Sequence, residues 1–175
     1  MGIPYVPVRG YAGSDVISRR DDFPMAPNPF NPEERFVVAK AINPDVAIFH
    51  GFQGDRAGNV LVGKRGNQTL LAQASRRCIV TVEEIVDKVD PDDPRGTFLP
   101  AIHVTAVVHA PKGAHPTACP GYYDMDERQI REYMEASVSD EALAAYLDKY
   151  IFAFKSHEEY LEALGLTPAR AKAGV

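Results

Sequence analysis

The pattern of apolar and polar positions is clearest over residues 44–86. Two short apolar runs, at 45–49 and 78–86, are rich in Val and Ile, as buried strands are. Between them lie a Gly-rich loop and a stretch at 68–76 whose apolar residues fall on one side of a helix. A strand, a helix and a second strand in this order predict a crossover between parallel strands. We therefore predict an α/β fold with an open, mostly parallel sheet and flanking helices, in which ligands bind at the carboxyl ends of the strands.

Before and after this stretch the pattern predicts shorter elements. Residues 1–10 alternate apolar side chains with two prolines, which is typical of an extended edge segment. Residues 19–32 are rich in Pro and Asn and predict an irregular loop, either a surface connector or an arm over a partner or pocket. We expect a short strand at 36–40, with a helix opened by Pro32 as the alternative. A further strand region is expected at 98–110, where apolar positions alternate.

Three helices are expected toward the C-terminus. Asp124 and Glu127 have the spacing of a capping box and open the first of them. A second helix follows, with an apolar stripe along one side. Ser156 and Glu159 form another capping box, and Gly165 would stop this last helix.

Composition and charge narrow the class of protein. With 175 residues, a hydrophobic fraction of 45% and a charged fraction of 25%, the chain is typical of a soluble globular protein. We assign residues 1–165 to one domain and the Ala- and Lys-rich residues 166–175 to a flexible tail. The net charge of −5 argues against a nucleic-acid partner, and no apolar run approaches the roughly 20 residues that span a bilayer. The widely spaced Cys78 and Cys119, and an N-terminus without a signal-peptide pattern, indicate a reduced, cytoplasmic protein.

The loop that follows the first apolar run carries candidate ligand-binding residues. Gln53, Asp55 and Asn59 offer directed hydrogen bonds, while Gly54 and Gly58 permit close approach of a ligand to the backbone. The same residues suit a turn in which Asp and Asn bond their own backbone. The pattern therefore leaves a binding role and a turn both open.

A nearby stretch matches the phosphate-loop pattern except at its last position. Residues 58–65, GNVLVGKR, follow the pattern until Arg65, which stands where a Ser or Thr must hold magnesium. The interior of this stretch is apolar and strand-like, whereas a phosphate loop needs a nest of free amides. We interpret the stretch as a hairpin.

Histidines and a cysteine could form a metal site, but their spacing fits no compact ligand signature. We interpret those on strands as core or edge residues, and we predict no metal site and no bound cofactor. His115 differs, because it lies close to Tyr122 on a Gly- and Pro-rich loop, where binding residues are common. The residues considered as metal ligands are His50, His103, His109, His115 and Cys119.

Two glutamates, Glu83 and Glu84, lie inside the second apolar run. A charge in a buried strand is costly unless it is paired or hydrogen-bonded. We therefore expect one of the two to face the interior or a crevice; the alternative is that both lie at an exposed strand end. The sequence contains neither a G-x-S-x-G motif nor a Cys and His spacing typical of nucleophilic catalysis.

Four motifs, in order along the chain, resemble the α (A) subunit of family I CoA-transferases, with the glutaconate and 3-oxoacid enzymes as the nearest kin. They are GIPYVPVRG followed by GSD, then NPDVAIFHGFQGDRAGNV, IVTVEEIV and APKGAHPTACPGYYDMD, and the match covers about residues 2–150. Gly54 stands where the family more often has Ala. The resemblance implies the open α/β fold of these enzymes (NagB/RpiA-like). It also implies a reaction in which CoA moves between carboxylic acids through an acyl anhydride and a glutamyl–CoA thioester.

The resemblance further implies an incomplete catalytic centre in this chain. The glutamate nucleophile belongs to the β (B) subunit, so no catalytic residue is assigned here, and Glu33, Glu83 and Glu84 are not given that role. Because the α subunit in this family is considerably longer, we expect this chain to be truncated at its N-terminal side. The expected assembly is a hetero-oligomer with the β subunit, completed by a chain that supplies the missing N-terminal part.

The expected substrate is a CoA thioester. Ring-opening CoA hydrolases of steroid degradation share the same subunit pattern, so a subunit of an acyl-CoA hydrolase is one alternative function. A non-catalytic scaffold or regulatory domain that kept the fold is another. The residues expected to shape the cleft are Gln53, Asp55, Gly58, Asn59, His115 and Tyr122.

Overall fold

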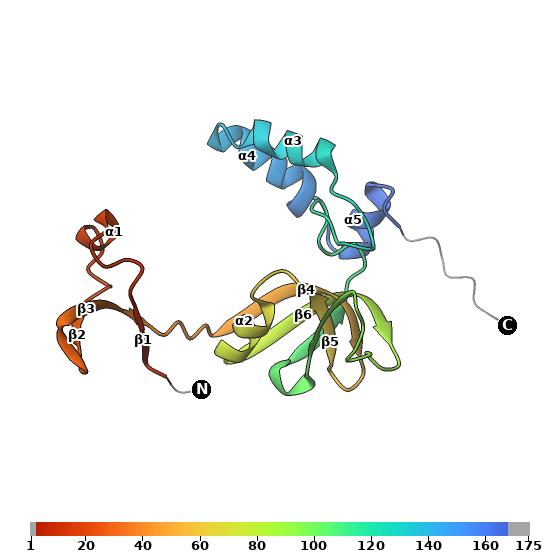
Figure 1. The fold of residues 1–175 in the computed structure, drawn as a ribbon. Helices are drawn as coiled ribbons and strands as arrows, with labels where there is room; N and C mark the ends of the chain where they lie inside the picture. Colours follow the sequence, from red (N-terminus) through yellow and green to blue (C-terminus); the bar gives the residue numbers. More distant parts are fainter. Residues whose placement is uncertain (1–2, 168–175) are drawn as a thin grey trace. The chain divides into compact units, whose positions relative to one another are not determined.

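The computed structural model describes residues 3–167 and divides into two compact units, Met1–Asp45 and Val46–Val175 (Figure 1). The boundary falls inside the range 1–165 predicted as one domain, and that assignment stays a prediction. Residues 168–175 of the predicted tail lie outside the described residues. In the part of the chain that the structure describes, no helix is long and apolar enough to cross a membrane.

The first unit is a three-stranded antiparallel sheet with strand order β1-β3-β2. The predicted edge segment and the predicted strand at 36–40 are confirmed, whereas residues 25–28 form a strand and not an irregular loop. Pro27 is tolerated there because β2 is an edge strand. The elements of this unit are β1 (Tyr5–Val8), α1 (Asp15–Ser18), β2 (Met25–Asn28) and β3 (Asn31–Lys40).

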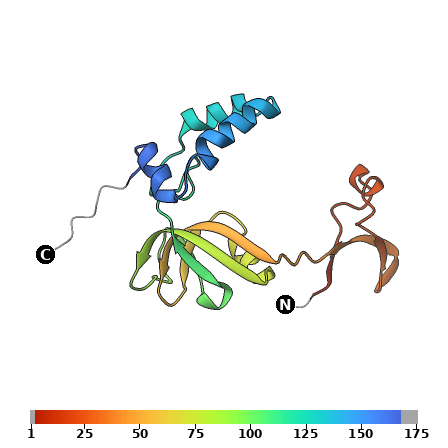
Figure 2. The same ribbon diagram turned by 180° about the vertical axis from the view of Figure 1, so that it is seen from behind.

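The second unit contains a five-stranded sheet with order β7-β5-β4-β6-β8 (Figures 1 and 2). β4 lies parallel to β6, with α2 (Gln68–Ala74) in the connection between them, so the predicted crossover is confirmed. β6 is also parallel to β8, but β5 runs antiparallel to both β4 and β7. The sheet is therefore mixed, because the two parallel pairings that the prediction of a mostly parallel sheet requires are joined by two antiparallel pairings of β5. The strands are β4 (Val46–Asp55), β5 (Val60–Gly63), β6 (Arg77–Val86), β7 (Gly96–Leu99) and β8 (Ala106–His109).

Two short connections, one after β4 and one after β7, give the sheet its mixture of parallel and antiparallel pairings. Gly58 has a φ of +92° in a tight turn that leads from β4 directly into β5, and its N–H donates to the Asp55 carbonyl at 3.0 Å. The hairpin interpretation of residues 58–65 is thereby confirmed. Residues 98–110 form two strands on opposite edges of the sheet, because the chain leaves β7 at Pro100 and makes a 3-10 turn, Ala101–His103, before β8.

Two clusters of buried apolar side chains stabilise the second unit. The first includes Ala72 of α2 and residues of four strands. The second packs against the loop between β8 and α3, because Cys119 belongs to it and Tyr122 and Tyr123 pack on it. Both cysteines are free thiols. The first cluster consists of Ala47, Val60, Val62, Ala72, Cys78, Val80, Val82 and Leu99, and the second of Phe52, Leu61, Val89 and Cys119.

The C-terminal part of the second unit is helical, as predicted. The first helix begins later than expected, because Asp126 and not Asp124 caps it: the Asp126 carboxylate accepts the N–H of the residue three positions later at 3.0 Å. The Ser156 hydroxyl accepts from the Glu159 N–H at 3.2 Å, so the predicted cap of the last helix is confirmed. The helical elements are α3 (Glu127–Ala136), α4 (Asp140–Leu147), a π-helical turn (Asp148–Phe152) and α5 (His157–Ala163).

Candidate functional site

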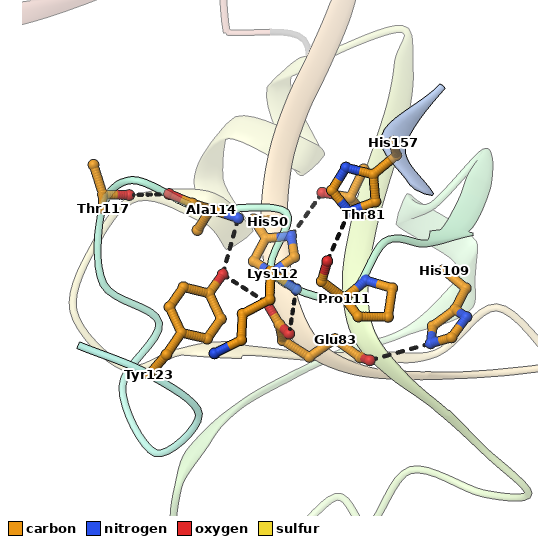
Figure 3. Close-up of polar contacts among 10 residues, drawn as sticks. All are labelled: His50, Thr81, Glu83, His109, Pro111, Lys112, Ala114, Thr117, Tyr123 and His157. Carbon is orange, nitrogen blue, oxygen red and sulfur yellow. Dashed lines mark hydrogen bonds and ion pairs between the residues drawn. The ribbon is translucent and has the colours of Figure 1, made fainter. Parts of the chain in front are cut away.

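Glu83 of β6 is the centre of a buried polar cluster (Figure 3). The residue is only 7% exposed, so its charge needs partners. His50 Nε2 and the Tyr123 hydroxyl each lie 2.7 Å from Oε1, and the backbone N–H of Lys112 donates to Oε2 at 2.8 Å. Both carboxylate oxygens are therefore hydrogen-bonded, which compensates for their burial.

Strand pairing explains why these side chains meet. His50 lies opposite Thr81 in the parallel pair of β4 and β6, and Glu83 follows two residues later on the same face. Because a carboxylate only accepts hydrogen bonds, His50 Nε2 carries the proton, and Nδ1 accepts from the Thr81 hydroxyl at 2.8 Å. Glu84 is exposed instead and accepts from Gln53 Nε2 at 2.8 Å. The expectation that one of the two glutamates faces the interior is confirmed.

The loop between β8 and α3 is fixed onto this cluster. Lys112 has a φ of +59°, which residues other than glycine rarely adopt, and its N–H points to the carboxylate. The Ala114 N–H donates to the Tyr123 hydroxyl at 3.0 Å. A Cβ atom at Gly113 would lie 2.9 Å from His50 Cε1, so glycine is needed for this close approach. Burial, and next the hydrogen bond to the carboxylate, raise the pKa of Tyr123 above its usual value.

A cleft of about 410 Å³ opens beside the cluster. His50 and Phe52 of β4 line it together with Cys119 of the loop. Lys64 and Arg65, which follow β5, are exposed and line the same cleft. Arg95, which is paired with Asp93, lines the cleft as a third cation. A cleft with apolar walls and several cations suits a ligand that has an apolar part and an anionic part.

Cys119 brings a third potential metal-ligating side chain to the cluster. It is 3% exposed, and the ligand atoms of His50, Glu83 and Cys119 all lie within 4.8 Å of one another. Burial, and next the charge of Glu83, raise the pKa of the Cys119 thiol to about 11. Of the residues that the sequence suggested as metal ligands, the structure thus brings His50 and Cys119 together, and it adds Glu83.

Asp55 and Asn59, two of the predicted cleft residues, hold neighbouring chain segments. Asp55 is 4% exposed, and its carboxylate accepts from the Asn59 N–H at 2.9 Å and from the Val89 N–H at 3.1 Å. Asn59 Oδ1 accepts from the Ala101 N–H at 3.0 Å. Burial alone would raise the pKa of Asp55, but the hydrogen bonds from the Asn59 side-chain amide, and next those from the Val89 and Asn59 N–H groups, hold this pKa below its usual value. This geometry favours the turn alternative, and a role in ligand binding stays a prediction.

Three other predicted cleft residues lie in different surroundings. Gln53 is paired with Glu84, and Gly58 forms the β4–β5 turn. The ring of Tyr122 packs against Phe52, with ring centroids 5.9 Å apart, and so supports a wall of the cleft. The Tyr122 hydroxyl is buried and makes no hydrogen bond. Burial, and next the charge of Glu84, raise the pKa of Tyr122 to about 12.

His115, the sixth predicted residue, packs against α5. Its Nδ1 lies 2.6 Å from the Tyr160 hydroxyl, and its Nε2 lies 3.4 Å from a carboxylate oxygen of Asp126. Burial lowers the pKa of His115, although the charge of Asp126 partly offsets this effect. His115 lines a second cavity, of about 440 Å³, with Gln129 and Tyr146. The structure therefore does not bring the six predicted residues together in one cleft.

Sequence reasoning left His50 and Tyr123 out of the site. The available signal was the glutamate pair inside an apolar strand, because a buried carboxylate requires donors. One donor, His50, stands 33 positions before Glu83. Only the register of β4 against β6 places the two on one face.

Comparison with known proteins finds CoA-transferase subunits whose sequences are similar to that of this chain. Residues 32–110 match the family described as Coenzyme A transferase. The chain is 38% identical over 161 residues to the A subunit of 3-oxoadipate CoA-transferase from Pseudomonas knackmussii, a match that covers 91% of this chain and 56% of that protein. It is 35% identical over 184 residues to the A subunit of glutaconate CoA-transferase from Acidaminococcus fermentans, a match that covers 95% of this chain and 58% of that protein.

Structural similarity agrees with the sequence matches. The crystal structure of glutaconate coenzyme A-transferase from Acidaminococcus fermentans matches with a TM-score of 0.87 and 33% identity, over 94% of this chain and 57% of that chain. This similarity confirms an α/β fold with a mixed sheet and helices. The cholesterol ring-cleaving hydrolase IpdA subunit of Rhodococcus jostii is 29% identical over 175 residues, with 93% of this chain and 57% of that protein covered. The chain spans about half the length of the curated relatives it matches.

Proposed function

Because most of this chain is like the α subunit of family I CoA-transferases, we propose that it is one subunit of an enzyme that moves CoA between carboxylic acids. The observation that carries the proposal is the similarity to glutaconate CoA-transferase in both sequence and fold, over 95% and 94% of this chain. The substrate class is then a CoA thioester of a carboxylic acid. A chain of the α type also requires a β subunit, and we propose a hetero-oligomer with that partner.

The proposed reaction needs a glutamate nucleophile, which we assign to the partner subunit. Its carboxylate attacks the thioester carbonyl, forms an acyl anhydride and releases the CoA thiolate. The thiolate then attacks the glutamyl carbonyl, which gives a glutamyl–CoA thioester and releases the donor acid. The acceptor acid passes through the same two steps in reverse. Glu83 is unsuited to this role, because donors already occupy both of its oxygens.

We assign the cleft beside His50 to binding of the CoA thioester. Lys64 and Arg65 would attract an anionic part of the substrate, such as a phosphate or a carboxylate, while Phe52 offers an apolar contact. In this proposal Asp55 and Asn59 act indirectly, because they fix the β4–β5 turn from which the strand leads to Lys64. Tyr122 acts by supporting Phe52.

Reconstitution with a β subunit tests the proposal. The complex should transfer CoA from an acyl-CoA donor only when an acceptor carboxylic acid is present. Incubation with acyl-CoA alone should leave a thioester on the partner subunit. Borohydride reduction of this thioester should inactivate the complex, and mass spectrometry should show a mass change on the partner chain. CoA release at an unchanged rate without an acceptor would contradict transfer. Full activity of the partner without this chain would favour a scaffold or regulatory role.

A hydrolase subunit is a second candidate, which the similarity to the IpdA subunit favours. Water would then replace the acceptor acid, and a carbon–carbon bond of a CoA-linked ring would be the one that breaks. Reaction in ¹⁸O-labelled water separates the two candidates. A hydrolase incorporates one solvent oxygen into its product in each turnover, whereas a transferase takes the oxygen of the new thioester carbonyl from the acceptor acid.

A further inference from the structure

We propose that His50, Glu83 and Cys119 form a binding site for one zinc ion. The three side chains come from β4, from β6 and from the loop after β8, and their ligand atoms lie within 4.8 Å of one another. One nitrogen, one carboxylate oxygen and one sulfur form a donor set that Zn²⁺ binds in proteins. The proposal involves no CoA chemistry, so it stands or falls independently of the proposed function.

The surrounding hydrogen bonds orient each ligand toward a common point. Thr81 Oγ1 contacts His50 Nδ1 at 2.8 Å, which leaves Nε2 to face Glu83 (Figure 3). The Lys112 N–H donates to Glu83 Oε2 at 2.8 Å and the Tyr123 hydroxyl donates to Oε1 at 2.7 Å, so the ion would take the position on Oε1 that His50 Nε2 occupies now. Metal-binding histidines and carboxylates typically have such partners on their second polar atom.

The spacing of the three atoms requires only small adjustments. In a tetrahedral site with bonds of about 2.0–2.3 Å, neighbouring ligand atoms are about 3.3–3.8 Å apart. His50 Nε2 and Glu83 Oε1 are now 2.7 Å apart and would separate slightly, while the most distant pair, within 4.8 Å, would close. His50 would then bind through Nε2 and donate its Nδ1–H to the Thr81 hydroxyl.

The site would have one open position toward the cleft. His50 and Cys119 both line the cleft, so a water molecule or a ligand group could complete the coordination from that side. Three protein ligands with one open position are the arrangement of zinc sites that bind a substrate or activate water. Glu83 and a Cys119 thiolate together would neutralise the charge of the ion.

Cobalt substitution of the full chain tests the proposal. The chain is stripped of metal with a chelator and titrated with Co²⁺, then with Zn²⁺. We expect one equivalent of Co²⁺ to produce thiolate-to-cobalt charge-transfer absorption, which Zn²⁺ abolishes by displacement. Cys119→Ser should lose this absorption. Cys78→Ala should retain it, because Cys78 lies in the other apolar cluster.

Two outcomes would overturn the zinc site. One is that neither ion binds near one equivalent at micromolar concentration. The other is a charge-transfer band that survives in Cys119→Ser. Should Cys119→Ser fail to fold, X-ray absorption of the zinc-loaded wild-type chain decides: one sulfur ligand beside nitrogen and oxygen ligands supports the site, and a shell without sulfur overturns it.

Discussion

Val107 of β8 occupies the space that a side chain at Gly54 of β4 would need. A Cβ atom at Gly54 would lie 2.5 Å from Val107 Cγ1 and 3.5 Å from both methyl carbons of Val82. The glycine and the valine must therefore be considered as a pair.

The first prediction concerns this pair. Gly54→Ala should lower the free energy of unfolding by about 1–3 kcal/mol, because overpacking forces neighbouring side chains to shift. The double variant Gly54→Ala with Val107→Ala should be more stable than the sum of the two single changes predicts. Urea denaturation measures the free energy of unfolding of the two single variants and of the double variant. Gly10→Ala is the control, since a Cβ there meets nothing within 4 Å. Strict additivity would show that the two residues do not compete for space.

The second prediction concerns the buried carboxylate. Glu83→Ala leaves the donors of His50, Tyr123 and Lys112 unpaired, and it should cost about 3 kcal/mol or more. Glu84→Ala is the matched control: this neighbour is exposed, and its loss should change stability by less than about 0.5 kcal/mol. Denaturant unfolding of the two variants measures the difference. If both variants lost the same free energy of unfolding, the hydrogen bonds around Glu83 would make no net contribution to stability.

A pair of adjacent tyrosines gives the third prediction. Tyr123→Phe removes a hydroxyl that accepts from Ala114 and donates to Glu83, and it should cost about 1–2 kcal/mol. Tyr122→Phe removes a buried hydroxyl without a hydrogen bond, so stability should stay the same or rise. Thermal unfolding compares the two. Faster hydrogen exchange of the Ala114 amide, in Tyr123→Phe alone, would locate the effect in the loop.

The fourth prediction concerns acid sensitivity. The pKa of Asp55 is lowered in the folded chain, so its contribution to stability is present above the unfolded pKa of about 4 and is lost as the pH falls through the lower folded value. Asp55→Asn should therefore be less stable at pH 7 and should lose less stability on acidification than the wild type. The exposed Asp87 provides a control as Asp87→Asn. Parallel stability curves for wild type and Asp55→Asn between pH 7 and pH 3 would refute this account.

The fifth prediction concerns the cleft. In the proposed complex with a β subunit, the double change Lys64→Glu and Arg65→Glu should raise KM for the CoA thioester roughly tenfold, which is about 1.4 kcal/mol, with a smaller effect on kcat. The effect should weaken at high salt, because exposed charges are screened. Arg128→Glu with Arg131→Glu makes the same change of charge on α3, outside the cleft, and should leave KM unchanged. If both double variants behave alike, the effect is one of net charge and not of this site.

The crossover could be predicted because its two strands are long and rich in Val and Ile. The hairpin of β5 on β4 could also be predicted, but β7 could not, because it has four residues and pairs with β5 through contacts distant in sequence. The alternating run at 98–110 has the right period for a strand, but it contains Pro100 and the 3-10 turn that separate two edges of the sheet. Periodicity reports local conformation, whereas the partner of each strand is a tertiary property.

In the candidate site, too, the local contacts could be predicted from the sequence, whereas the contacts between strands could not. Asp55 and Asn59 could be recognised as a turn from their local pattern, and the structure gives them hydrogen bonds of that kind. The pairing of His50 with Glu83 depends on the register of two strands, which no local pattern encodes. The unusual glutamates in an apolar run indicated that partners exist, but not which residues they are.

The loop between β8 and α3 is attached to Glu83 by the Lys112 N–H and the Tyr123 hydroxyl, and this attachment has a consequence for ligand binding. Any outward movement of this loop breaks hydrogen bonds to Glu83, the carboxylate that also joins β6 to β4 through His50. The wall of the cleft is thus preorganised, and a ligand that enters it loses little additional conformational entropy of the protein. Selectivity at this wall then depends on shape and charge, because the wall cannot adapt to a poorly fitting molecule.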